Sequence, residues 1–175
     1  MEDTTLVKSS FSAPIHALIE KRDIPSWCFT LPEAEYHSAS PAHNACGATT
    51  TPDGRRMSSN VESLGGSLMV QHDVEESGAP DHLRLVSHSD LFTPTGHTKV
   101  GVIWDWSVTK SDDHTCECTN TVHSFATPEL VDFLGQQGMP WEVFQAARQP
   151  IAEAHNRQET PGFAKSMERH AVRRK

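Results

Sequence analysis

Two residues near the C-terminus have the types and the spacing that proton transfer or metal binding requires. His155 and Glu159 are four positions apart, and residues at that spacing are neighbours on the surface of a helix. As an acid–base pair, Glu159 would orient the imidazole and raise its basicity, so that His155 could transfer a proton near neutral pH. As metal ligands, both would bind from one helix face. An ordinary pair on an exposed helix face is the third interpretation.

Two polar residues of the predicted strands are candidates for the same site. In the stretch 67–76, His72 alternates with Val70, which predicts that both side chains face the interior. Asn120 shares the inward side of a later strand with Val122. A histidine facing a cavity could act as an acid or base, and a buried amide could donate to a substrate carbonyl. Structural hydrogen bonding in the core is the alternative for both.

Apolar side chains on the same predicted faces would form the wall of a small-molecule pocket. The clearest strand, residues 98–109, places two tryptophans on its inward side. They are either core residues or flat walls against a cyclic or polyene substrate. The full set expected to contact the substrate is Trp104, Trp106, Val70, Val102, Leu85, Phe144 and Ile151.

The helix that carries His155 and Glu159 is predicted over residues 141–159. Its buried stripe follows steps of three and four residues through Trp141, Phe144, Arg148, Ile151 and His155. Pro150 has no backbone donor and should kink the helix one turn before His155. The direction of that kink decides whether the pair faces a cavity.

Signals on either side of this helix set its expected limits. Thr127 is expected to cap a shorter preceding helix. Thr160-Pro161-Gly162 predicts the end of the long helix. A separate polar helix over residues 163–172 and a basic tail, ending at residue 175, would follow.

An antiparallel meander must position the rest of the site. From residue 43 to residue 126 the apolar pattern has a period of two, and turn sequences such as residues 51–54 separate about six strands. A single apolar sheet face needs a cover, which the helix of residues 141–159 supplies. Before the meander, residues 4–10 predict a first strand. A helix is expected to start at Ser12-Ala13-Pro14, with an inner face of Ile15, Leu18 and Ile19.

Composition and charge limit the classes of function. The chain has 175 residues, 36% of them hydrophobic, and a net charge of −8, which predicts one domain over residues 1–175 and argues against nucleic-acid binding. The four cysteines have no CxxC or framework spacing and the N-terminus has no signal-peptide pattern, so we expect a cytoplasmic protein. No apolar run approaches 18 residues, so no membrane span is expected.

Common cofactor and hydrolase motifs are missing from the sequence. It contains no P-loop, no GxGxxG, no GxSxG and no HExxH. Their absence argues against nucleotide-dependent chemistry, the common serine hydrolases and the zincin proteases. We therefore expect chemistry without a cofactor, with zinc as the alternative.

The order of a strand, a helix, a meander and C-terminal helices resembles the START and Bet v 1-like helix-grip superfamily. In that superfamily a curved sheet wraps around a C-terminal helix and encloses a ligand cavity. The resemblance covers nearly the whole chain and is one of layout. It implies an α+β fold with six to seven antiparallel strands. An NTF2-like cone or a lipocalin-type barrel is the structural alternative.

One group of the superfamily offers a parallel for the metal interpretation. The chain is similar to the phloroglucinol-type carbon–carbon hydrolases at His155 and Glu159, because those enzymes take zinc ligands of the His-x-x-x-Glu kind from the last helix. The resemblance implies further ligands from the sheet, for which His43 with Glu62 or His72 are candidates. A catalytic zinc needs three protein ligands and an open position.

Three functions are compatible with these features. The first is cofactor-independent cyclisation or isomerisation, including a pericyclic Diels–Alder type, of a hydrophobic metabolite such as a polyketide or terpenoid intermediate. Its catalytic residues would be His72, Asn120, His155 and Glu159. The second is zinc-dependent carbon–carbon hydrolysis with His43, Glu62, His155 and Glu159 as ligands. The third is a non-catalytic lipid or metabolite carrier. Each has a hydrophobic small molecule as partner, and a homodimer is an open alternative to a monomer.

Overall fold

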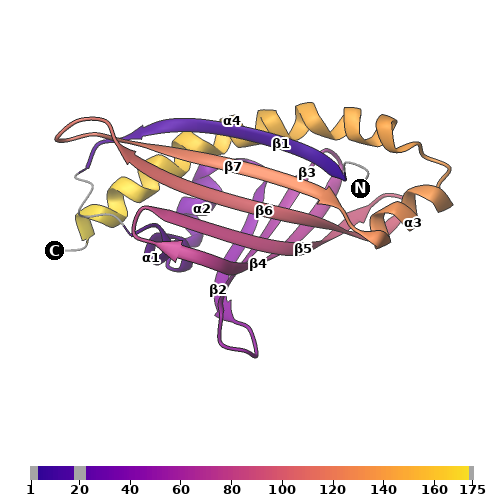
Figure 1. The fold of residues 1–175 in the computed structure, drawn as a ribbon, viewed down its shortest axis with the longest axis horizontal. Coiled ribbons are helices and arrows are strands. Elements are labelled where there is room, and N and C mark those ends of the chain that lie inside the picture. Colours follow the sequence, from indigo (N-terminus) through magenta and orange to yellow (C-terminus); the bar gives the residue numbers. More distant parts are fainter. Residues whose placement is uncertain (1–3, 18–22, 174–175) are drawn as a thin grey trace.

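One curved antiparallel sheet and one long helix make up most of the molecule (Figure 1). The computed structural model describes residues 4–17 and 23–173. The strands are β1 (Thr5–Ile15), β2 (His43–Thr50), β3 (Arg56–Leu64), β4 (Ser67–Ala79), β5 (His82–Thr93), β6 (Gly96–Lys110) and β7 (Cys116–Ala126). The helices are α1 (Ile24–Phe29), α2 (Glu33–Ala39), α3 (Pro128–Gln136) and α4 (Trp141–Arg173).

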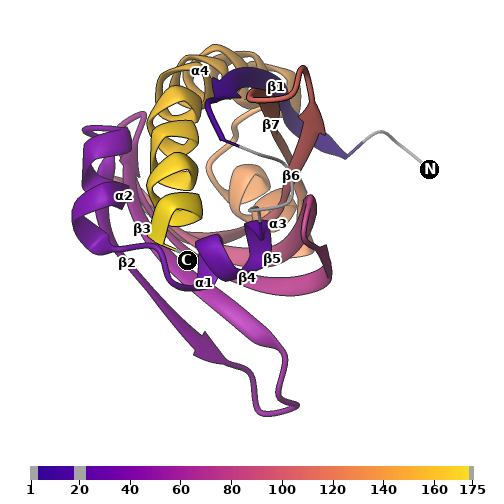
Figure 2. The same cartoon turned by 90° about the vertical axis from the view of Figure 1, so that its left-hand side faces the viewer.

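The sheet has the order β1-β7-β6-β5-β4-β3-β2 and does not close on itself. Each strand from β2 to β7 pairs with its neighbour in sequence, and β1 returns to pair with β7, from Thr5 opposite Phe125 to Ile15 opposite Cys116. Figure 2 shows the sheet curving around α4. The helix-grip prediction is confirmed, and the closed lipocalin-type barrel is wrong because β1 and β2 remain separate edges.

Side-chain amides of α4 satisfy the free edge of β1. The Gln149 amide nitrogen donates to the Lys8 carbonyl at 2.9 Å, and its amide oxygen accepts from the Lys8 N–H at 3.1 Å. One turn earlier, Gln145 donates to the Thr5 carbonyl at 2.6 Å. A carboxamide has the donor and acceptor of a peptide group, so these side chains continue the ladder and cover an edge that would otherwise be open.

The helix predicted to start at Ser12 is wrong, because β1 continues through Pro14 to Ile15. Ala13 and Ile15 are buried and alternate with exposed positions. Proline is tolerated here because β1 is an edge strand and needs no donor on its outer side. Leu18 and Ile19 lie outside the described residues. The first helices are α1, capped by the Asp23 side chain, and α2.

The predicted break at Thr160-Pro161-Gly162 is also wrong, because α4 is one helix of 33 residues that continues through Pro150 and Pro161. Figure 1 shows its path changing direction along its length. A Cβ on Gly162 would lie 2.6 Å from the Ala39 Cα, so this glycine lets α2 pack directly on α4. Phe163, Ala164 and Met167, which follow the proline, are buried in the core. Tertiary packing therefore overrides the local helix-breaking signal.

The inner face of β4 is the opposite of the predicted one. Gln71 and Asp73 are buried, whereas Leu68 on the other face is 39% exposed. The register pairs Met69 with Glu62 across β3 and β4, so Met69 and Gln71 share the face that Glu62 presents to the cavity. His72 and Val70 therefore lie on the convex side, and the prediction that they face the interior is wrong.

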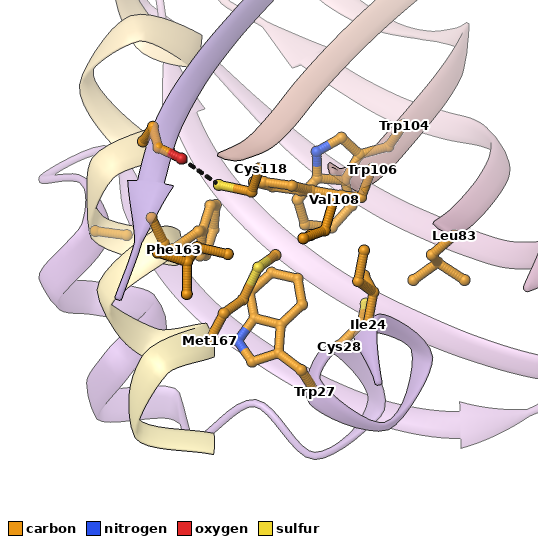
Figure 3. Close-up of a cluster of buried hydrophobic side chains, with 14 of the residues drawn as sticks. Ile24, Trp27, Cys28, Leu83, Trp104, Trp106, Val108, Cys118, Phe163 and Met167 are labelled. Atoms are coloured by element: carbon orange, nitrogen blue, oxygen red, sulfur yellow. Dashed lines mark hydrogen bonds between the residues drawn. The ribbon is translucent and has the colours of Figure 1, made fainter. Parts of the chain in front are cut away.

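Two apolar clusters divide the concave face along α4. The first lies where α1 and α2 meet the C-terminal part of α4, and we call it the filled end; Figure 3 shows its aromatic centre around Trp27, Trp106 and Phe163. The second surrounds the N-terminal part of α4 and α3, and we call it the hollow end because most of its residues also line a cavity. The members of the second are Leu6, Val7, Leu91, Val100, Val102, Leu130, Leu134 and Phe144.

The four cysteines are free thiols. Figure 3 shows the Cys118 thiol donating to the Ala13 carbonyl, at 3.3 Å. Burial raises the pKa of the Cys28 thiol strongly and that of Cys46 to about 11, so both thiols are protonated at neutral pH. Along the described parts of the chain, no helix is both long and apolar enough to cross a bilayer.

Candidate functional site

Four buried ligand-type side chains converge between the sheet and α4. His43 on β2 lies opposite Glu62 on β3 in the strand register, and His155 and Glu159 project from one face of α4. The His43 Nε2 is 3.1 Å from the Glu159 Oε2 and 3.8 Å from the Glu62 Oε1. The His155 Nε2 is 3.2 Å from the same Glu159 oxygen and 3.5 Å from the Glu62 Oε2. We call these four residues the His/Glu cluster.

An outer partner holds each member of the His/Glu cluster. The Tyr36 carbonyl is 2.7 Å from the His43 Nδ1, and the Tyr36 hydroxyl donates to the Glu62 Oε1 at 3.0 Å. The Tyr36 ring also stacks on the His43 imidazole, with ring centroids 4.0 Å apart. Burial raises the pKa of Tyr36, so its hydroxyl remains a donor. Tyr36 alone thus orients two of the four residues.

The two helical members have partners of their own. The Asn120 amide donates to the Glu159 Oε1 at 3.0 Å, which leaves the Oε2 directed at the two histidines. The Ser40 hydroxyl lies 3.4 Å from the His155 Nδ1. Outer partners of this kind fix the orientation of metal-binding side chains in proteins.

The tautomer of His43 follows from its carbonyl partner. A carbonyl only accepts, so the Nδ1 carries the proton. In the neutral imidazole the Nε2 then has a lone pair, and that lone pair faces carboxylate oxygens. A proton shared between the His43 Nε2 and Glu159, or a cation bound between them, removes this repulsion.

His155 has the same need for a positive charge or a cation. Its side chain is 9% exposed, and its Nε2 is buried without a hydrogen bond to any described residue. Burial lowers the pKa of His155, but the close contacts with the Glu159 and Glu62 carboxylates and their negative charges outweigh burial and raise it to about 10. Burial likewise raises the pKa of Glu159, and the two histidines outweigh it and lower that pKa. An ion pair between His155 and Glu159 is thus the stable state without a metal.

The geometry of the His/Glu cluster fits a divalent metal ion. One ligand atom from each of the four residues can be chosen so that all lie within 4.8 Å of one another. Ligands about 2.1 Å from a tetrahedral zinc are separated by about 3.4 Å, close to the distances above. Nitrogen and carboxylate oxygen are both ligands that zinc accepts. Metal binding by these four residues stays a prediction.

The cluster lies at one end of an apolar pocket. Glu62, His155 and Glu159 line the pocket, and side chains of the sheet and of α4 form its walls. Among the predicted substrate-contacting residues, Trp104, Val102, Phe144 and Ile151 line it as expected. Trp106 and Leu85 are fully buried in the filled end instead. Val70 and His72 lie outside; the His72 side chain is 43% exposed and its Nε2 is 3.4 Å from the Asp90 Oδ2.

Asn120 faces inward as predicted, but the side chain is fully buried behind the pocket wall. Its amide oxygen accepts from the Trp104 indole nitrogen at 2.9 Å, and its amide nitrogen donates to Glu159 and, at 3.3 Å, to the Thr160 hydroxyl. All of these contacts are within the protein. Asn120 therefore positions Glu159 and Trp104, and the expected contact with a substrate carbonyl stays a prediction.

Tyr36 and Arg148 are the residues whose roles the sequence did not reveal. Tyr36 is the only tyrosine in the chain, and nothing in its local sequence marks it as a partner of the site. Its partner Glu62 is 26 positions away, and no local pattern reports such a pairing. Arg148 was recognised as part of the buried stripe, but its position in the pocket wall depends on the sheet that faces it.

Searches by sequence found no matching family model and no matching curated protein. Solved structures do match. The Zhui aromatase/cyclase from Streptomyces sp. R1128 is 12% identical, with a TM-score of 0.61 over 95% of this chain and 94% of that one. A START superfamily protein from Mycobacterium smegmatis is 14% identical, with a TM-score of 0.52 over 95% of this chain and 97% of that one.

A third similar structure is the di-domain aromatase/cyclase BexL from the BE-7585A biosynthetic pathway. It is 16% identical, with a TM-score of 0.53 over 93% of this chain and 50% of that one. At these identities the comparisons establish the fold alone. The chain has the START/Bet v 1-like helix-grip fold, and aromatase/cyclases are among the proteins that share it.

Proposed function

We propose that this chain is a metal-dependent enzyme that acts on a hydrophobic, carbonyl-bearing small molecule. The observation that carries the proposal is the convergence of His43, Glu62, His155 and Glu159 at one end of an apolar pocket, with the buried His155 Nε2 only 3.2 Å from a Glu159 carboxylate oxygen. The reaction class that fits best is hydrolysis of a carbon–carbon bond next to a carbonyl group. Water adds to the carbonyl carbon, and the adjacent carbon–carbon bond breaks. One product is a carboxylic acid, and in the other product the released carbon takes up a proton.

The residues of the chain have separable tasks in this proposal. The four members of the His/Glu cluster would hold the metal, and Tyr36 and Asn120 orient them. Apolar walls that include Trp104 and Val102 bind the substrate and limit the access of water. A bound zinc would polarise a carbonyl oxygen and lower the pKa of a bound water. Since zinc can expand to five ligands, four protein ligands still permit a bound substrate or water.

Metal analysis tests the proposal directly. Purified protein should contain about one zinc per chain, and chelated protein should take up Co²⁺ with visible absorption bands that report nitrogen and oxygen ligands. His43→Ala, Glu62→Gln, His155→Ala and Glu159→Gln should each abolish both signals. Asn120→Ala should weaken zinc binding about 10- to 100-fold, because it removes an outer partner of Glu159.

His72→Ala is the matched control, because it removes a histidine from the convex face and leaves the cavity intact. It should bind metal like the wild type. If the wild type binds no zinc, or if the four cluster variants bind zinc as tightly as it does, the metal proposal is wrong.

A second candidate is cofactor-independent cyclisation of a poly-carbonyl substrate. The buried His155–Glu159 ion pair favours it, because the imidazolium could protonate a carbonyl oxygen as a new carbon–carbon bond forms. Some proteins of the same fold are aromatase/cyclases. The two candidates differ under chelation: turnover of a poly-β-ketone that persists in metal-free protein and is lost in His155→Ala would favour the cyclase. Ligand binding without turnover, in both metal-bound and metal-free protein, would indicate a carrier instead of an enzyme.

A further inference from the structure

Arg148 is a charged residue in the wall of an otherwise largely apolar pocket. It lies on α4, and it lines the same pocket as the His/Glu cluster. Its side chain is partly buried, and burial lowers the pKa of its guanidinium. Arginine stays charged at any physiological pH, so the protein keeps a partly desolvated cation beside the space that a ligand would fill.

No carboxylate of the described residues lies within ion-pair distance of Arg148. Other arginines pair with acids: Arg56 with Glu75, Arg84 with Glu76, and both Arg169 and Arg173 with Glu35. Those pairs lie at the surface, where they contribute little. Arg148 has a larger desolvation cost than these paired arginines, and a partly buried charge normally requires a partner.

Neutral groups hold the Arg148 guanidinium in place. The Nη2 donates to the Ser67 hydroxyl at 3.1 Å and the Nη1 to the Gly65 carbonyl at 3.5 Å, and the group lies over the Phe144 ring, 5.0 Å from its centroid. A Cβ on Gly65 would lie 3.0 Å from the Nη1, so the glycine of the β3–β4 turn leaves room for the side chain. A guanidinium has five N–H donors in one plane, and these contacts use only part of them.

The position of Arg148 relative to the His/Glu cluster sets the spacing of two polar ends. Arg148 and His155 are seven residues apart on α4, which is about 10.5 Å along the helix axis. Ile151 and Ala152 lie between them on the pocket wall, and Val102 faces them from β6. The pocket wall therefore carries a cation and, about two helical turns further along α4, ligand-type groups, with apolar side chains between them.

We propose that Arg148 binds an anionic group of the substrate, a carboxylate or a group of like charge, about 10 Å from the carbonyl that reacts at the His/Glu cluster. The planar fork of the guanidinium matches a carboxylate in two parallel hydrogen bonds. The substrate class is then an amphipathic acid with a hydrophobic middle. The inference rests on the proposed function for the reacting end, but the anion contact can be measured without turnover.

Two probes of equal chain length test the contact: octanoate and 1-octanol. Their dissociation constants are measured by calorimetry and by the NMR shift of the indole N–H of Trp104, a residue that lines the pocket. Wild-type protein should prefer octanoate at least about tenfold, the size of a charge-assisted hydrogen bond. Arg148→Gln should remove the preference and leave octanol binding unchanged, and Arg148→Lys should keep part of it.

Arg157→Gln is the matched control, since Arg157 lies on the same helix, is exposed and contacts the Phe11 ring instead of the pocket. It should keep the full preference. If wild-type protein does not prefer octanoate, or if Arg148→Gln retains the preference, the inference is wrong. Raising KCl should weaken octanoate binding by the wild type and leave octanol binding unchanged. The absence of such a salt effect would also contradict the inference, even if Arg148→Gln failed to fold.

The same titrations in Glu159→Gln separate this inference from the proposed function. A preference for octanoate that persists in a variant without zinc would support the Arg148 contact even where the metal proposal failed. A wild type that binds zinc but has no preference for octanoate would support the metal proposal and contradict the Arg148 contact.

Discussion

The filled end and the hollow end of the concave face are built on the same strands but have different contents. At the filled end, α1, α2 and the C-terminal part of α4 all insert side chains, and Trp27, Trp106 and Phe163 pack edge to face with ring centroids 5.4–5.7 Å apart. At the hollow end, the N-terminal part of α4 and α3 cover apolar strand residues without filling the space. A single curved sheet thus provides a core where three helices meet and a pocket where helical cover is thinner.

The His/Glu cluster lies where the two ends meet. His43 stacks on Phe163 of the filled end, with ring centroids 5.5 Å apart, whereas Glu62, His155 and Glu159 line the pocket. Rigid packing on one side and open space on the other is the arrangement that a preorganised site needs. The filled end can therefore be understood as the support that keeps the cluster in place.

Two leucines of β5 offer the sharpest test of this difference. Leu83 is fully buried in the filled end, and Leu91 lines the pocket with 8% exposure. Leu83→Ala should lower the free energy of unfolding by about 3–5 kcal/mol, because it creates a new cavity. Leu91→Ala should lower the free energy of unfolding by only about 1–2 kcal/mol, because Leu91 already borders the pocket. Urea denaturation measures both, and equal costs would mean that the ends do not differ in packing.

Asp73 tests the buried polar residues on the covered face of β3 and β4. It is fully buried, and its Oδ2 accepts from the Asn60 amide at 3.0 Å. Burial, with a smaller effect from the charge of Glu62, raises the pKa of Asp73 from 3.8 to about 8. The unfolded chain therefore binds fewer protons than the folded protein between these values, so this residue lowers stability as pH rises from about 4 to about 8.

Asp73→Asn keeps the contact with Asn60 and cannot ionise. Relative to wild type, it should gain about 2–3 kcal/mol of unfolding free energy between pH 5 and pH 9, less than the full pKa shift implies because water relieves part of the cost. Urea titrations of both proteins at the two pH values measure the gain. A constant difference between them would show that Asp73 is ionised throughout.

Two helical glycines give a smaller contrast of opposite sign. A Cβ on Gly162, at the filled end, would lie 2.6 Å from the Ala39 Cα, whereas a Cβ on Gly135 in α3 would meet nothing within 4 Å. Gly162→Ala should cost about 1–3 kcal/mol by pushing α2 away from α4. Gly135→Ala should gain about 0.5–1 kcal/mol, because alanine favours the helix. Thermal unfolding checks both, and a gain at both positions would mean that α2 does not pack tightly on α4.

The sequence by itself determined the local features of this protein. The alternation of apolar residues in 98–109 and the glycine-containing turns predicted the meander, and the register confirms it. Steps of three and four residues predicted that His155 and Glu159 share the inner face of the last helix, where they now line the pocket. These features depend on neighbours within a few positions, which is why a period in the sequence reports them.

Tertiary structure decided which of those features became a site. His43 and Glu159 are 116 positions apart, and Tyr36 and Glu62 are 26 apart, so only the wrapping of the sheet around α4 brings them together. The inner face of β4 was predicted wrongly because a period of two does not say which face is covered, and the polar face of Gln71 and Asp73 is the covered one. The helix predicted to end at residue 159 continues to Arg173, where Gly162 packs against Ala39, a contact that no local pattern contains.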